Sequence, residues 1–186
     1  MLMRSAQHGF MDLFDPAPDF TQPIDALMTC HRRIEQKLVV LNKLARHLTQ
    51  RGPNEEARVA AAGIRRYFCM AAPMHHQDEE ADLFPLLLQQ AKKPEMQARA
   101  FDIIARLMVE HRQFEALWCE IEPVLTMIAT GENQTFAPDL IKHFSHAYRQ
   151  HIANEESILL PMAQHLLSAG QLATLGLSMK ARRMQK

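Results

Sequence analysis

Two segments of eleven residues, 75–85 and 151–161, are copies of one pattern. The first reads HHQDEEADLFP and the second HIANEESILLP, with His, Glu, Glu, Leu and Pro identical at a constant offset of 76 residues. A second pair, HRRIE at 31–35 and HRQFE at 111–115, shares His, Arg and Glu at an offset of 80 residues. Such self-similarity indicates a chain built from two copies of one structural unit. We therefore expect two similar hairpins, each carrying a lone histidine and then an H-x-x-x-E.

The residues around these segments follow a helical period. From Ile24 to about Gln50, apolar side chains recur at spacings of three and four, and Gly52 with Pro53 ends the pattern. Valine and isoleucine do not alternate with polar residues over the length of a strand. Helices are predicted over about 24–50, 55–90, 94–131 and 135–168, with a short fifth over 171–183. The predicted fold class is all-α, an up-and-down four-helix bundle.

Asparagine, proline and glycine set the expected helix ends. Asn54 is a typical N-cap before the acidic first turn of the second helix. Pro73 and Pro85 are expected to bend that helix or end it early, and a kink is expected in the third helix near Pro123. In the fourth helix we place Pro138 in the first turn, with Gly170 beyond the end.

Length and composition bound the number of domains and the location of the chain. With 186 residues, 47% of them hydrophobic, the chain suits a single domain over 1–186, with a bundle core at about 23–168 and an extended N-terminal lead-in. Three widely spaced cysteines favour a reducing, cytoplasmic environment. The N-terminus lacks the apolar core of a secretory signal, and no apolar stretch approaches the roughly 18 residues of a membrane span.

The charges of the chain exclude some classes of partner. Twenty-one basic and twenty-one acidic residues cancel, so no long-range field would recruit nucleic acid or an anionic membrane. The basic stretch 180–186 is interpreted as a solvated end. The oligomeric state is left open by the sequence.

The spacing of the repeated residues predicts metal chemistry. Residues at i and i+4 share one helical face, so an imidazole and a carboxylate from each H-x-x-x-E can point at one place. With the two lone histidines, six donors converge, which are His31, His75, Glu79, His111, His151 and Glu155. Six donors exceed the four of a structural zinc and suit two adjacent cations bridged by carboxylates. A mixture of imidazole and carboxylate donors favours iron or manganese over calcium or magnesium.

The pattern H…HxxxE…H…HxxxE, with its LFP and LLP endings, resembles the hemerythrin-like HHE cation-binding family over about residues 19–168. The resemblance implies a four-helix bundle with a non-haem di-iron centre, with two Fe ions as cofactor and Mn or Zn as substitutes. It also implies bridging roles for Glu79 and Glu155, with His31 and His75 on one iron and His111 and His151 on the other.

Two departures from relatives within this family bear on function. Oxygen-carrying hemerythrins have a further histidine one turn before the position of His111, where this chain has Leu107. Fewer protein donors leave more open positions on the metals. The extra N-terminal segment with a cysteine pair, common in the branch that repairs iron–sulfur clusters, has no counterpart here, which makes that role less favoured.

Neighbouring residues have alternative interpretations. If the second helix were rotated about its axis, His76 instead of His75 would be the ligand. The repeat offset argues against this alternative. Glu80 and Glu156 are expected to support the ligands or lie on the helix surface, and Glu35 and Glu115 likewise. The alternative for the whole set is a group of buried ion pairs without metal. That alternative is costly, because buried carboxylates and imidazoles need partners or protons.

The function favoured by these residues is the binding of O₂ or a related diatomic ligand such as NO, for sensing, storage or delivery. Two alternatives use the same donors: an enzyme that reduces peroxide or nitric oxide, and a protein that stores or donates iron. The sequence assigns no catalytic residue and leaves open whether the protein is an enzyme.

Overall fold

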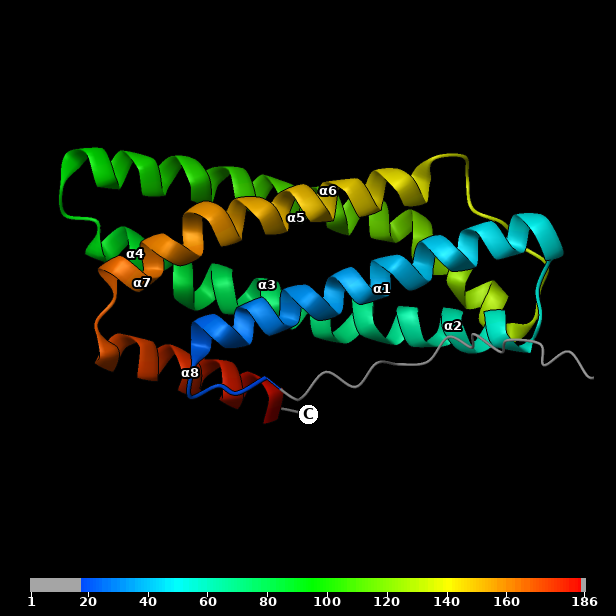
Figure 1. The fold of residues 1–186 in the computed structure, drawn as a ribbon, viewed down its shortest axis with the longest axis horizontal. Coiled ribbons are helices and arrows are strands. Elements are labelled where there is room, and N and C mark those ends of the chain that lie inside the picture. Colours follow the sequence, from blue (N-terminus) through cyan, green and yellow to red (C-terminus); the bar gives the residue numbers. More distant parts are fainter. Residues whose placement is uncertain (1–17, 185–186) are drawn as a thin grey trace, which may run out of the picture.

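The computed structural model describes residues 18–184, and within them every long segment is helical (Figure 1). The first arm of the bundle is α1 (Pro23–Arg51) and the third is α5 (Pro94–Thr130). The second arm joins α2 (Glu55–Arg66), η1 (Tyr67–Ala71), α3 (Ala72–Gln77), η2 (Asp78–Leu83) and α4 (Phe84–Gln90). The fourth joins α6 (Leu140–Asn154), η3 (Glu155–Leu159) and α7 (Leu160–Leu166), and α8 (Ala169–Met184) follows. The predicted all-α bundle is confirmed.

The arms pack as a square, in which α1 and α5 are each flanked by the second and fourth arms. In Figure 1, α8 runs alongside the half of the bundle in which α1 begins. The predicted N-terminal lead-in falls almost wholly on residues 1–17, which lie outside the described residues. No helix in the described part of the chain is long and apolar enough to cross a membrane.

Three prolines in the second and fourth arms each follow a π-helical turn. The turn η1 precedes Pro73, η2 precedes Pro85, and η3 precedes Pro161. Proline has no N–H and its ring crowds the carbonyl four residues earlier, so a widened turn before it lets the helix continue. Neither Pro73 nor Pro85 therefore ends the second arm, which runs to Gln90. Two of these turns begin at Asp78 and Glu155, within the repeated motif.

The ends of the later helices differ from the sequence prediction. The fourth arm begins at Leu140 rather than near Thr135, because Asp139 has a left-handed φ of 62° that an α-helix does not continue. Pro138 thus lies in the turn before the helix instead of in its first turn. Gly170 lies inside α8, which begins at Ala169. The third helix is continuous through Pro123 and ends where Gly131 adopts φ 96°.

The buried apolar side chains form two clusters along the bundle axis. One cluster includes Leu27, Leu83, Leu107 and Leu159, and the other includes Ile34, Ala72, Phe114 and Ile152. The six predicted ligands lie where the two clusters meet on each arm, and His151 directly precedes Ile152 of the second cluster. The fold therefore encloses a polar layer with apolar packing on both sides.

Gly176 brings α8 against the start of α1. A Cβ at this position would overlap the carbonyl oxygen of Phe20, whereas a Cβ at Gly63 on α2 would meet no atom within 4 Å. We expect Gly176→Ala to lower the free energy of unfolding by about 1–3 kcal/mol through overpacking. Gly63→Ala, the matched control, should raise it by about 0.5–1 kcal/mol. Urea unfolding of both variants checks this, and equal effects would contradict the close approach.

Candidate metal centre

The six residues predicted as ligands lie together in the buried polar layer. His31 comes from α1, His75 and Glu79 from the second arm, His111 from α5, and His151 and Glu155 from the fourth arm. Each is at most 1% exposed. In each H-x-x-x-E, one helical turn carries the imidazole and the carboxylate to the same level of the bundle.

Glu155 reaches histidines of both halves of the chain. Its Oε2 lies 3.0 Å from Nε2 of His31, and its Oε1 lies 3.1 Å from Nε2 of His151. Glu79 is placed in the same way, with Oε1 3.4 Å from Nε2 of His75 and Oε2 3.5 Å from Nε2 of His111. Each carboxylate thus spans the two histidine pairs.

The donors fall into two overlapping groups of four. One is His31, His75, Glu79 and Glu155, and the other is Glu79, His111, His151 and Glu155, with the ligand atoms of each group within 4.8 Å of one another. Two ligands on opposite sides of one ion lie about 4.2 Å apart, so each group is close to the size of one coordination sphere. The two glutamates belong to both groups.

The hydrogen bonding of these atoms fits a cation. Both oxygens of Glu79, both oxygens of Glu155, both ring nitrogens of His75 and Nε2 of His31 are buried without a hydrogen bond of acceptable geometry. Buried polar atoms are nearly always hydrogen-bonded, and the exceptions need an explanation. In addition, Nε2 of His111 and Nε2 of His151 face one another at 3.2 Å. Cations that accept a lone pair from Nε2 of each imidazole and from the carboxylate oxygens would account for these atoms, except for Nδ1 of His75, which points away from Glu79.

The outward nitrogens of three histidines contact glutamates. Nδ1 of His31 lies 2.9 Å from Glu156, Nδ1 of His111 lies 2.7 Å from Glu80, and Nδ1 of His151 lies 2.8 Å from Glu110. A carboxylate at Nδ1 fixes the imidazole tautomer that leaves Nε2 free to ligate. Glu80 and Glu156 therefore occupy the supporting positions considered for them from the sequence.

Glu110 was not singled out from the sequence. Its contact with His151 joins residues 41 apart, and the equivalent of Glu110 at the repeat offset of 80 is Cys30, so the repeat gives no indication of it. Its position directly before His111 was the one available clue. Glu35 and Glu115 are exposed, and Glu115 pairs with Arg112 at 2.7 Å.

The carboxylates of Glu79 and Glu155 differ in their pKa. Burial together with the neighbouring charge of Glu155 raises the pKa of Glu79 well above its usual value. Burial opposes ionisation of Glu155 too, but His151 and His31 hold its pKa well below the usual value. Burial acts to lower the pKa of His151, yet Glu155 and Glu110 raise it to about 9. Without a cation the layer therefore holds protons, which metal binding must displace.

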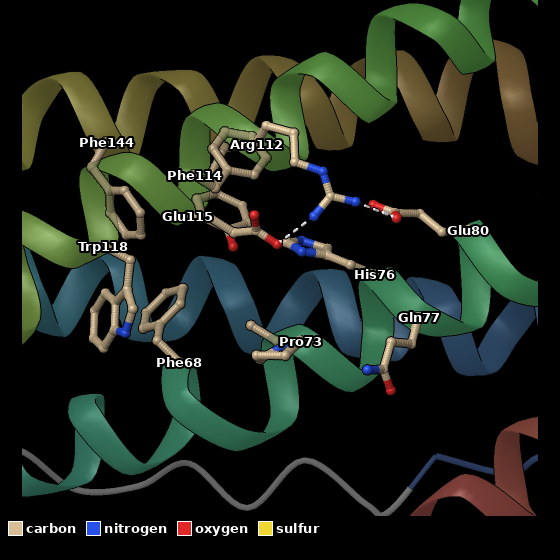
Figure 2. A pocket seen from close by; sticks show the side chains of 12 residues that line it. Phe68, Pro73, His76, Gln77, Glu80, Arg112, Phe114, Glu115, Trp118 and Phe144 are labelled. Atoms are coloured by element: carbon tan, nitrogen blue, oxygen red, sulfur yellow. Dashed lines mark hydrogen bonds and ion pairs between the residues drawn. The ribbon is translucent and has the colours of Figure 1, made fainter.

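A cavity of about 290 Å³ opens beside the layer (Figure 2). Its walls include Phe68, Trp118 and Phe144, which Figure 2 shows on one side, and the guanidinium of Arg112 lies on the other side between Glu80 and Glu115. His76 lines the same cavity. The repeat offset favoured His75 over His76 for the ligand face, yet His76 too is only 9% exposed and stacks on His111 with ring centroids 4.0 Å apart.

Comparisons with known proteins agree with this geometry. The family model described as hemerythrin HHE cation binding domain matches residues 22–163. A protein of Haemophilus influenzae, described as uncharacterized, is 32% identical over 178 residues, covering 95% of this chain and 99% of the relative. The matched range contains all four arms of the bundle up to Ala163 and all six buried donors. The chain belongs to the hemerythrin HHE cation-binding domain family.

Proposed function

We propose that this protein holds two iron ions in the buried layer and binds a diatomic ligand, O₂ or NO, for sensing, storage or delivery. The observation that carries the proposal is that Glu79 and Glu155 each place one oxygen beside one histidine pair and the other oxygen beside the second pair. Carboxylates in this position bridge the two cations of di-iron bundles. Membership of a cation-binding family supports the same proposal.

Each ion would have two histidines of its own and share both glutamates. His31 and His75 would hold one ion, and His111 and His151 the other. Mixed imidazole and carboxylate donors suit iron or manganese, and zinc could substitute. Iron would supply a redox-active cation with a position open to a small ligand. The chain's own part is to orient Nε2 of three imidazoles through glutamates at Nδ1, and to exclude water with the flanking apolar clusters.

Metal analysis and melting test the metal part of this proposal. Protein from iron-replete cells should contain roughly two irons per chain, as in di-iron bundles. A cation at 100 times its Kd adds about 2.7 kcal/mol to the stability, so the loaded protein should melt roughly 5–10 °C above the stripped protein at pH 7.5. The difference should shrink as the pH falls below about 9, where His151 of the metal-free layer takes up a proton, and should disappear below about pH 6, where protons compete for the other imidazoles as well. Coincident melting at pH 7.5 would contradict a tight metal site.

Stopped-flow spectra of the anaerobically reduced, iron-loaded protein separate the functional alternatives. Binding of O₂ or NO that is reversed by removing the gas supports the proposed function. Catalytic turnover of peroxide or NO would instead support an enzyme, and rapid loss of iron to a mild chelator would support storage or donation. Stripped protein serves as the control, because any signal it gives does not come from the centre.

A further inference from the structure

We propose that His76 is a fifth imidazole ligand, donated from the wall of the cavity to the cation held by His111 and His151. This inference rests on the proposed metal centre and adds to it a ligand that the repeat does not contain. The repeat equivalent of His76 is Ile152, a buried apolar residue. The extra donor would therefore make the two halves of the centre unequal.

The ring nitrogen of His76 lies in a third donor group, which it forms with His111 and His151 alone. His76, His111 and His151 each offer a ring nitrogen within 4.8 Å of the others. The glutamates at Nδ1 leave Nε2 as the free nitrogen of His111 and of His151, and these two Nε2 atoms lie 3.2 Å apart. The ring of His76 stacks on His111 at an interplanar angle of 15° and meets His151 edge-on at 72°. Nitrogens of three imidazoles thus lie close together, and the stacked ring of His76 would have to turn for its Nε2 to share one cation with Nε2 of His111.

The Nε2 atom of His76 is buried and has no hydrogen-bond partner. It shares this state with the atoms of His31, His75, Glu79 and Glu155 that face the proposed cations. Leaving such an atom unpaired lowers stability, and coordination of a cation would remove that cost. A role in packing alone leaves the cost unexplained.

His76 also connects the layer to the cavity. Among the described residues, it is the one member of the three donor groups that lines the 290 Å³ cavity (Figure 2). A small ligand that enters through this cavity meets His76 before any other donor. His76 would then add a third imidazole to the cation beside His111 and His151, whereas the cation beside His31 and His75 would have two.

A crystal structure of the Fe(II)-loaded protein, prepared without oxygen, tests the assignment directly. We expect two anomalous peaks, one of them within about 2.3 Å of Nε2 of His76, a distance typical of imidazole ligation. Two peaks with Nε2 of His76 more than about 3 Å from both would overturn this inference and leave the di-metal proposal intact. Absence of any metal from the layer would overturn both.

Release of Fe(II) to a chelator provides the test in solution. His76→Phe keeps a ring against His111 but removes the nitrogen, and one of the two ions should then leave at least about tenfold faster. The control is His146→Phe on the exposed face of α6, which should release both ions at the wild-type rate. Wild-type release from His76→Phe would contradict ligation. If that variant does not fold, His76→Gln takes its place, and the wild-type crystal structure still decides.

Discussion

Glu155→Gln is expected to remove most of the bound metal while leaving the helical fold intact. One oxygen of Glu155 lies beside His31 and the other beside His151. The substitution therefore removes a negative charge shared by both proposed ions and replaces the oxygen donor to one of them with an amide NH₂, which cannot ligate. Altering residues that only support ligands already costs about 10–100-fold in metal affinity. Loss of a bridging carboxylate should therefore cost more than about a hundredfold. Glu79→Gln should behave in the same way.

Glu80→Gln and Glu156→Gln are the matched controls, because each lies one residue further along the chain than a bridging glutamate. Their carboxylates contact only the outward Nδ1 of a single histidine within the layer. At saturating iron these two variants should retain both ions. Iron per chain after gel filtration, with far-UV circular dichroism to verify folding, gives the comparison. Equal loss of iron in all four variants would show that the bridging assignment is wrong.

Removal of Arg182 and Arg183 from α8 is expected to destabilise the metal-free protein strongly. Asp78 is fully buried, and its carboxylate accepts hydrogen bonds from both arginines, including one of 2.7 Å from Arg183. Arg182→Met with Arg183→Met would leave this carboxylate buried without a cationic partner. Breaking such a buried pair costs about 3–5 kcal/mol, which corresponds to a fall of roughly 6–20 °C in Tm.

Two further variants distinguish the effect of breaking the buried ion pair from the effect of losing positive charge in general. Asp78→Asn, added to the variant with Arg182→Met and Arg183→Met, should recover much of the stability, because the unpaired charge is gone. Arg65→Met breaks an exposed ion pair with Glu122 on the opposite end of the bundle and should cost no more than about 1 kcal/mol. Urea unfolding of stripped protein measures all of these changes. A loss as small as that of Arg65→Met would mean that α8 does not neutralise Asp78.

Asp78 links the C-terminal helix to the proposed centre. It directly precedes Glu79 in η2, and α8 packs on both η2 and α1. Arg183 also lies over the ring of Phe20, 4.7 Å from its centroid. The short C-terminal helix predicted from the sequence thus packs against the turn that carries Glu79.

The sequence by itself determined the helices and the six residues of the polar layer. Four helices could be placed because apolar spacing, Asn54 and Gly131 are local features. His75 with Glu79, and His151 with Glu155, could be matched because helical pitch alone puts positions i and i+4 on one face. That these residues bind metal remains a proposal, although the family is established.

Only the tertiary structure decided which neighbours support that layer. The contact of Glu110 with His151, the burial of His76 against His111, and the pairing of Asp78 with Arg182 each join different helices. Such contacts depend on how far each helix is rotated about its axis and on which helix it packs against. The π turns before Pro73, Pro85 and Pro161 change that rotation within two of the arms. Helical periodicity carries no information about these rotations, because it fixes positions along one helix and not between helices.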